Sequence, residues 1–403
     1  MLNKNYIILL LSTMLMGDKV IPTERQHALS NLAPKDNFVF RLKGKTRTTK
    51  FSYNESGEKV RLGEELNHIT LDQNIFSSLS VFGAGATLGT TSSSMLFDSQ
   101  RFELSFGYGI TENLTIGLIV PFGTVNNRVN FSVSNATLGI NPSYNNSLAP
   151  SATNLPYLPT NAGVAPFSTA DLQNLIASEP YGYKPIASTR TTGFADPTIG
   201  LLYQVLKTKE SSFILGTGID IGIAKEDDSD NLVDVPINNG NSALRFRAEY
   251  YKNLKYNFDA YVRFEYGIEL EDKVTKRVPQ QGVLLAPKSS TERLTRDLGD
   301  YRTYELGLGK SVSNWRYAVK LYRLEKDVDN YSSDVGTDVS LLEANTKGLV
   351  NQWESEVSWS GIEAWSKGNL ALPLIVSLSY KETFSGRNGL DWTEYYFKVT
   401  SFF

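Results

Sequence analysis

The chain has 403 residues, a formal net charge of −3 and no cysteine. The absence of cysteine excludes a disulfide, a thiolate metal site and a cysteine nucleophile, and the slightly acidic balance argues against a general nucleic-acid binder. No internal run approaches the ~18–20 consecutive apolar residues of a membrane helix. A membrane β-barrel remains a possible fold class, because its strands carry apolar residues only at alternate positions.

The amino-terminal segment has the layout of a secretory signal peptide. Lys4 precedes a short apolar run from Tyr6 to Gly17, after which the chain turns polar. This run is too short for a spanning helix, so we expect residues 1–17 to be a signal peptide; a buried strand or helix is the alternative. Residues 18–35 are polar and irregular, and we expect a periplasmic segment or a plug in a pore.

The first alternating stretches predict a strand followed by a hairpin. Residues 37–51 place apolar side chains on one face and mostly basic ones on the other, as in a strand with one wet side. Residues 53–96 form a long connection. Residues 100–109 and 114–122 then alternate on either side of a four-residue turn, which is typical of a β-hairpin.

The longest polar stretch is residues 134–192, rich in Asn, Ser, Pro and Thr. Within it, residues 168–178 have the capping pattern of a short helix. A loop of this length in a compact fold is usually functional or disordered. The rest of the chain is a series of hairpins and a last strand: 193–206 with 213–224, 244–250 with 256–270, 304–308 with 315–324, 349–359 with 370–380, and 392–403.

The connection lengths alternate between short turns and long loops. This alternation is typical of outer-membrane barrels, which have short periplasmic turns and long extracellular loops. We therefore expect an all-β fold, a single antiparallel transmembrane β-barrel of about 12 strands over residues 36–403. An even number of strands places both termini on the periplasmic side.

The polar faces of the strands carry charges of both signs. Exposure of these charges to lipid would cost ~2–4 kcal/mol for each Arg or Lys at midplane depth, so in a membrane barrel they must face the lumen. The alternative interpretation is the solvated outer face of a soluble β-sandwich. Aromatic residues at strand ends favour the barrel, because membrane proteins place them at the interfaces. We expect the following residues to line the lumen: Arg245, Arg247, Glu249, Asp259, Arg263, Glu265, Glu305, Arg316, Lys320, Glu354, Glu356, Glu394 and Lys398.

The last strand ends on Phe403 with no polar tail, and this ending is similar to that of bacterial outer-membrane barrels. Its apolar face, made of Tyr395, Phe397, Val399 and Phe403, is expected to meet lipid and to act as the signal for the barrel assembly machinery. The other expected partners are outer-membrane lipid, lipopolysaccharide and a small-molecule solute.

Two glycine-rich motifs, residues 106–122 and 193–200, carry a resemblance to a family. The chain resembles the outer-membrane barrels associated with the meta-pathway of phenol degradation. This resemblance implies an outer-membrane channel or transporter for passive uptake of small hydrophobic or aromatic compounds. The motif positions are Gly107, Gly109, Asn113, Pro121, Gly193, Asp196 and Gly200. Asp196 has two interpretations, a partner for a luminal arginine or a turn-stabilising residue before Pro197.

Two other functions remain possible as alternatives to a channel. The long loops would suit a structural or adhesion barrel. A barrel enzyme needs a nucleophile and a base within hydrogen-bond reach, but the only histidines, His27 and His68, lie outside the predicted strands. We therefore expect no enzyme activity, catalytic residue, metal site or cofactor; the acidic run 226–230 is more typical of a solvated loop than of a cation site.

Overall fold

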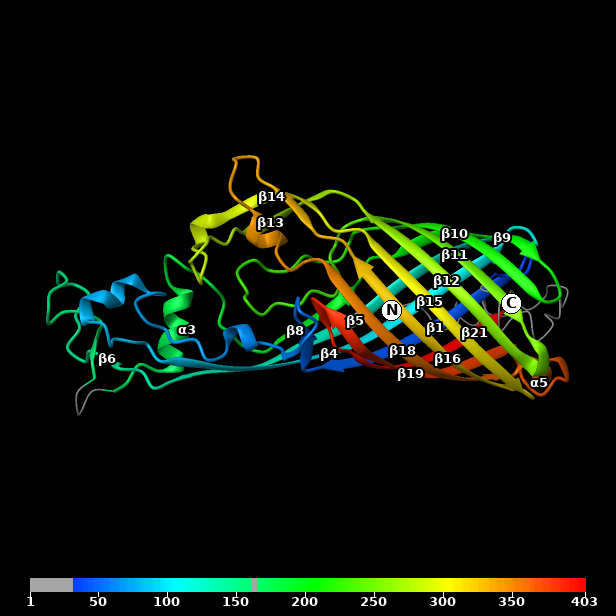
Figure 1. Ribbon diagram of the computed structural model, residues 1–403, viewed down its shortest axis with the longest axis horizontal. Helices are drawn as coiled ribbons and strands as arrows, with labels where there is room; N and C mark the ends of the chain where they lie inside the picture. The colour runs from blue at the N-terminus through cyan, green and yellow to red at the C-terminus, as the bar shows by residue number, and fades with distance from the viewer. Residues whose placement is uncertain (1–31, 161–164) are drawn as a thin grey trace, which may run out of the picture.

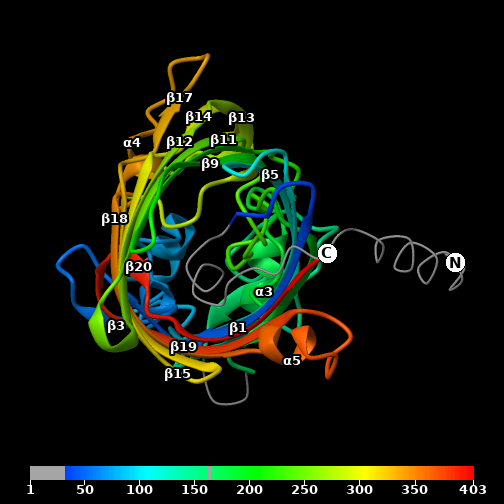
Figure 2. The ribbon, with the colours of Figure 1, turned by 90° about the vertical axis from the view of Figure 1, so that its right-hand side faces the viewer.

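Antiparallel strands close into a barrel in the computed structural model, which describes residues 32–160 and 165–403. Figure 2 shows it end-on. Its order around the wall is β4-β1-β21-β19-β18-β16-β15-β12-β11-β10-β9-β5, and β5 pairs with β4 to complete the circle. The twelve strands are β1 (Phe38–Thr49), β4 (Thr90–Gly109), β5 (Leu114–Ser134), β9 (Thr198–Lys207), β10 (Ser211–Asp220), β11 (Ala243–Asn253), β12 (Phe258–Glu269), β15 (Tyr301–Val312), β16 (Trp315–Lys326), β18 (Gly348–Ser360), β19 (Leu374–Arg387) and β21 (Thr393–Phe402).

The first and last strands pair with each other and so close the wall between the two ends of the described chain. Their register runs from Val39 opposite Phe402 to Thr48 opposite Thr393. The backbones of Phe38 and Phe403 then exchange two hydrogen bonds of 2.9 Å. The prediction of a twelve-stranded antiparallel barrel is therefore confirmed.

The outer face of the barrel is apolar and has an aromatic row near each end. Leu306, Val319 and Leu378 are each more than half exposed, as expected for side chains that meet lipid. On β18, Trp359 lies opposite Trp315 at the end with the short turns. Trp353, six residues away, belongs to the other row. With about 3.3 Å per residue, the two rows are about 20 Å apart along the strand.

Several strand boundaries differ from the sequence-based expectation. Tyr256 and Asn257 have φ angles of 58° and 62° and form the turn before β12, so Tyr256 is not the first residue of that strand. β19 begins only at Leu374, directly after Pro373, and the connection before it contains the helix α5 (Ile362–Ser366). Strands β4 and β5 extend to residues 90 and 134, so residues 90–96 belong to a strand rather than to the long connection.

The long outer parts of β4 and β5 carry an extracellular subdomain with a core of its own (Figure 1). Its helix α3 (Thr169–Ala177) has a capping box between Ser168 and Asp171, so the predicted helix is confirmed. Leu172 and Ile176 of α3 are buried against the segment 71–88. The helix therefore packs within this subdomain, beyond the rim of the barrel, and does not fold into the lumen.

Shorter elements shape the remaining loops. They are β2 (Phe51–Tyr53), β3 (Lys59–Arg61), η1 (Glu64–Leu66), η2 (Ser77–Phe82), β6 (Leu138–Ile140), β7 (Tyr157–Pro159), β8 (Thr189–Phe194), η3 (Lys255–Asn257), β13 (Asp272–Arg277), η4 (Lys288–Ser290), β14 (Thr291–Asp297), β17 (Asn330–Ser332), α4 (Ser340–Glu343) and β20 (Gly389–Leu390). None of the helices in the described residues is long and apolar enough to cross a membrane. The expected signal peptide, residues 1–17, lies outside the described residues, as do residues 18–31.

Candidate functional site: the charged lumen of the barrel

The lumen is built by the two-residue period of the strands. Because successive side chains point to opposite faces, each strand sends alternate residues inward, and the register aligns them in rows. One row joins Glu249 of β11, Arg263 of β12 and Glu305 of β15. Arg263 pairs with both carboxylates, at 3.0 Å to Glu249 and 2.8 Å to Glu305. Inward charges thus become cross-strand ion pairs.

Six neighbouring strands, β10 to β12, β15, β16 and β18, form what we call the mixed wall. It combines positive and negative side chains in a dense lattice, and it contains eleven of the thirteen residues expected to line the lumen. Its inward charged residues are Asp220, Arg245, Arg247, Glu249, Asp259, Arg263, Glu265, Glu269, Glu305, Arg316, Lys320, Lys326, Glu354 and Glu356. Asp220, Glu269 and Lys326 were absent from the expected set, although each lies on the polar side of its strand.

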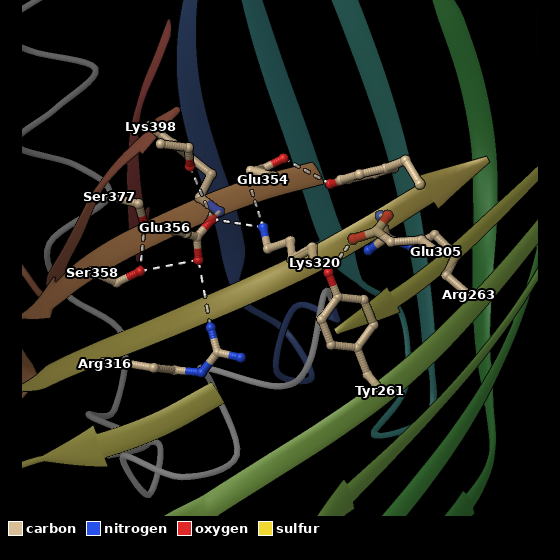
Figure 3. Close-up of polar contacts among 12 residues, drawn as sticks. Tyr261, Arg263, Glu305, Arg316, Lys320, Glu354, Glu356, Ser358, Ser377 and Lys398 are labelled. Atoms are coloured by element: carbon tan, nitrogen blue, oxygen red, sulfur yellow. Dashed lines mark hydrogen bonds and ion pairs between the residues drawn. The ribbon is translucent and has the colours of Figure 1, made fainter. Parts of the chain in front are cut away.

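Glu356 is the most connected carboxylate of this lattice (Figure 3). It accepts a hydrogen bond of 2.9 Å from Lys320 and has Arg316 and Lys398 within 3.5 Å. Lys320 also donates to Glu354, at 2.9 Å. Because Lys398 comes from β21 and Arg316 from β16, this cluster links three strands of the wall.

Tyrosines complete the lattice and were missed by the sequence analysis. Tyr261 donates to Glu305, and Tyr322 donates to Glu354 at 2.9 Å. Buried carboxylates need several donors, and a phenol reaches where a second cation does not fit. The signal in the sequence was the inward phase of these tyrosines, shared with the charged residues of the same strands.

Four consecutive strands, β19, β21, β1 and β4, form what we call the basic wall. Its positive side chains outnumber its carboxylates: the cations are Arg41, Lys43, Lys45, Arg47, Arg101, Lys381 and Lys398, and the carboxylates are Glu103 and Glu394. Only Glu394 and Lys398 were in the expected set. The basic face of the first strand was visible in the alternation, but the sequence did not show which strands would flank it.

A cavity of about 410 Å³ lies between the two walls at the periplasmic end. Its lining includes Arg41 and Lys398 of the basic wall together with Arg263, Arg316, Lys320, Asp259 and Glu356 of the mixed wall. Leu32, from the segment before the first strand, also lines the cavity and packs against Ile214, Tyr251 and Tyr261. The described end of the predicted 18–35 segment therefore lies inside the barrel mouth.

The segment 32–35 is held by the wall of the barrel on its other side. The amide of Ala33 donates to the Thr115 hydroxyl at 2.9 Å, and Ala33 packs with Val39 and Phe402. Gly109 has no room for a side chain, because a Cβ there would lie 2.6 Å from the carbonyl carbon of Pro34. This motif glycine therefore permits close approach of the segment.

The other motif residues have structural positions at turns and close contacts. The carbonyl of Asn113 accepts from Gln204 at 2.8 Å. Gly107 faces inward beside Val39 and Thr115, Gly193 lies near Ile237, and a Cβ on Gly200 would lie 2.8 Å from the Thr217 oxygen. The expected strand 114–122 placed Pro121 near its end, but in the structure Pro121 lies inside β5, at the gap between the pairings with β8 and β9. A proline is tolerated there because its missing N–H has no ladder partner to lose.

Asp196 anchors a loop rather than a luminal arginine. It lies in the break between β8 and β9, and its carboxylate accepts from the amides of Ile223 and Ala224, both at 2.8 Å. It also accepts from the Asn238 side chain and the Gly240 amide. No arginine of the described residues pairs with it, so the geometry favours the structural interpretation.

Arg277 joins three extracellular loops above the lumen. It pairs with Asp230 at 2.6 Å, donates to Gly182 and Ala286, and lies 3.8 Å from the ring centre of Tyr183. Burial raises the pKa of the Tyr183 phenol above its ordinary value, so this phenol stays protonated and donates to Ala286 at 2.8 Å.

The acidic run 226–230 contributes to the same contacts between loops. Asp227 pairs with Lys276 at 2.5 Å, and Asp228 pairs with Lys184. The hydrogen bond from Lys184 lowers the pKa of the Asp228 carboxyl. No group of three His, Asp or Glu side chains that would suit a metal ion occurs in the part of the chain that the structure describes. His68 lies in an extracellular connection with a φ of 57°, and His27 falls outside the described residues.

The expected assembly signal lies on the outer face of β21. Tyr395 and Phe397 are 55% and 38% exposed, and Val399 and Phe403 continue the same phase. The ring of Tyr395 is tilted against that of Tyr380, which is tilted against that of Trp353, with 5.3 Å between ring centres in both pairs. The last strand therefore contributes to the outer aromatic row.

Comparisons with known proteins agree with a barrel. A family model described as "Putative MetA-pathway of phenol degradation" matches residues 83–389. The COG4313 outer membrane channel from Pseudomonas putida F1 has a TM-score of 0.52 at 10% identity, over 93% of this chain and 98% of that one. This likeness bears on the fold alone.

Two further solved structures are less similar. The NanC porin has a TM-score of 0.36 at 6% identity, over 90% of this chain and 98% of that one. The CymD monoaromatic hydrocarbon channel has a TM-score of 0.34 at 9% identity, over 91% of this chain and 88% of that one. All three structures are channels or porins by name. No curated protein matches the chain.

Proposed function

The chain belongs to the family of the MetA pathway of phenol degradation, and we propose that it is an outer-membrane channel for passive uptake of small molecules, small aromatic compounds among them. The observation that carries the proposal is the inversion of polarity across a closed wall. Apolar side chains cover the outside, and ion pairs line the inside around a cavity of about 410 Å³. A barrel in lipid with a wet lumen has the architecture of a channel.

The segment 32–35 supports a narrow channel rather than a wide pore. Leu32 lies in the periplasmic mouth and contacts strands β10, β11 and β12, while Ala33 contacts β5 and the ends of β1 and β21. We propose that this segment constricts the mouth. Solutes then pass beside it or after it moves, which restricts passage to small molecules.

The test uses the purified, folded barrel in liposomes and in planar bilayers. We expect discrete conductance steps and swelling in isosmotic solutions of small solutes, with little swelling in sugars of several rings. Heat-unfolded protein at the same protein-to-lipid ratio is the control. Absence of both conductance and solute entry, with the barrel shown to be folded by its heat-modifiable gel mobility, would refute the channel.

A second candidate function rests on the extracellular subdomain. Its buried core joins residues 71–88 with Leu138, Phe167 and α3, so it is an ordered surface module rather than a slack loop. Val81 and Leu148 are largely exposed on it. Deletion of residues 140–185 should abolish surface adhesion and leave the conductance intact if adhesion is the function; an altered conductance would favour the channel.

A further inference from the structure

Positive charge is concentrated on one side of the lumen. The basic wall has seven cations and two carboxylates, whereas on the mixed wall carboxylates outnumber cations. Strands β5 and β9, between the two walls, send no charged residue inward except Lys207 at the end of β9. A small solute in this lumen therefore meets a surplus of cations on one side, in a confined space where charges are screened less than in bulk water.

Two of these cations have no carboxylate of their own. Arg47 and Lys381 lie on either side of Glu394 in one row across β1, β21 and β19. Within the residues that the structure describes, neither has a carboxylate oxygen within the 4.0 Å of an ion pair. Glu394 pairs instead with Lys45, at 3.6 Å. The Nε of Arg47 is buried and has no acceptor.

Both cations lie against aromatic rings. The Arg47 guanidinium is 4.2 Å from the ring centre of Trp392, and the Lys381 ammonium is 3.7 Å from that of Tyr322. Cation–π contact accounts for their place, but a ring supplies no acceptor in the plane of a guanidinium. A carboxylate would supply it, with bonds stronger than those between neutral groups. An attached aromatic ring would lie along Trp392 or Tyr322.

The cations continue as a ladder from this position toward the cavity. On β1, Arg47, Lys45, Lys43 and Arg41 recur at every second residue, about 6.6 Å apart at 3.3 Å per residue. The ladder ends at Arg41, which lines the periplasmic cavity together with Lys398. Successive weak sites along a path allow a bound ion to leave as well as to enter.

From these observations we infer that the basic wall binds the carboxylate of small aromatic acids, so that the channel prefers aromatic anions to neutral or cationic aromatic compounds. This inference rests on the proposed channel function and specifies its substrate class. It makes Arg47 and Lys381 the specificity-determining residues at the extracellular end of the path.

The experiment compares three compounds of similar size that differ in charge, benzoate, benzyl alcohol and benzylamine. Their entry into liposomes that contain the barrel is corrected for entry into empty liposomes. We expect barrel-dependent entry of benzoate to exceed that of benzyl alcohol about tenfold, the factor supplied by one charge-assisted hydrogen bond, and benzylamine to be slowest. A reversal potential measured in a KCl gradient should show anion preference.

The double variant R47Q/K381Q removes the two cations and leaves a polar, unbranched side chain at each position. It should lower the benzoate to benzyl alcohol ratio at least fivefold and shift the reversal potential toward cations. The matched control is Lys310→Gln, which removes an exposed cation on the outer face of β15 beside Phe258. It should change neither quantity.

Three outcomes decide the matter. Preference for benzoate that falls in the double variant supports the inference. Equal or faster entry of benzyl alcohol, or a benzoate preference unchanged in the double variant, overturns it while leaving the channel function intact. Absence of barrel-dependent entry of all three compounds refutes the channel itself, and the inference with it.

Discussion

Gly109 decides how closely the segment 32–35 approaches the wall, and Gly109→Ala should dislodge that segment. A Cβ on Gly109 would lie 2.6 Å from the carbonyl carbon of Pro34 and 2.7 Å from the Ala33 oxygen. The Pro34 oxygen would lie nearer still, and ordinary contacts between such atoms are about 3.5 Å, so the segment must retreat by more than about 1 Å. β4 itself pairs with β1 and β5 over most of its length, so the segment yields before the barrel does.

The strain and the anchoring of the segment are of similar size. Overpacking by one methyl group costs about 1–3 kcal/mol. Burial of Leu32 stabilises the docked segment by about 1.5–3 kcal/mol, and the hydrogen bond from Ala33 to Thr115 adds about 0.5–1.5 kcal/mol. Each 1.4 kcal/mol changes the docked fraction about tenfold. We therefore expect the undocked fraction to rise about fivefold to a hundredfold.

Because the chain has no cysteine, Leu32→Cys provides a clean probe. Its reaction with a membrane-impermeant maleimide from the periplasmic side should be at least fivefold faster with Gly109→Ala, and the single-channel conductance should rise. Gly107→Ala is the control, because a Cβ there meets only ordinary contacts from 3.4 Å outward. Equal labelling rates and conductances in the two alanine variants would show that the segment does not depend on Gly109.

Three more predictions follow from the lattice, the loops and the last strand. Glu356→Gln leaves Lys320 with one carboxylate. It should lower the free energy of unfolding in urea by about 1–3 kcal/mol and increase the anion selectivity of the channel. An unchanged unfolding free energy together with unchanged selectivity would contradict the central position of Glu356 in the lattice. Arg277→Gln should make residues 278–290 sensitive to protease while the melting of the barrel stays unchanged, whereas continued resistance would argue against Arg277 as the link between loops. Deletion of residues 402–403 removes the pairing with the start of β1 and should reduce the heat-modifiable barrel in the outer membrane, and an undiminished yield would exclude these residues as an assembly signal.

The twelve strands could be predicted because each carries its own period-two pattern. The pattern fails at turns that keep the alternation, and this is why Tyr256 was assigned to β12: a φ of 58° at a tyrosine has no signal in the sequence. It also fails where Pro373 delays the start of β19. The extracellular subdomain was missed because its core joins residue 71 to residue 176 through loops, and contacts between irregular segments leave no period.

The candidate site was predictable by residue type but not by partner. Inward phase identified Glu305 and Arg263 as luminal. Their pairing, however, depends on the register of β12 against β15, two strands separated by a long loop. The basic wall depends even more on distant contacts, because Arg47 lies opposite Glu394 only when the first strand pairs with the last. A surplus of charge on one side of a barrel is a property of strand order, and no single strand shows it.

The inward glycines explain how so many long side chains leave room in a barrel of twelve strands. The ring of Tyr261 lies over Gly307, and that of Tyr301 lies over Gly267. The guanidinium of Arg316 lies where a Cβ on Gly309 would be 2.8 Å from its central carbon. Each long side chain can therefore lie along the wall, because the adjacent position on the next strand has no side chain. From there Arg316 reaches Asp259 across β15 at 2.5 Å. Larger residues at these glycines would turn the same side chains toward the axis, so the ion pairs and the open space of the lumen have a common origin in the register that aligns glycine with the bulky residue of its neighbour.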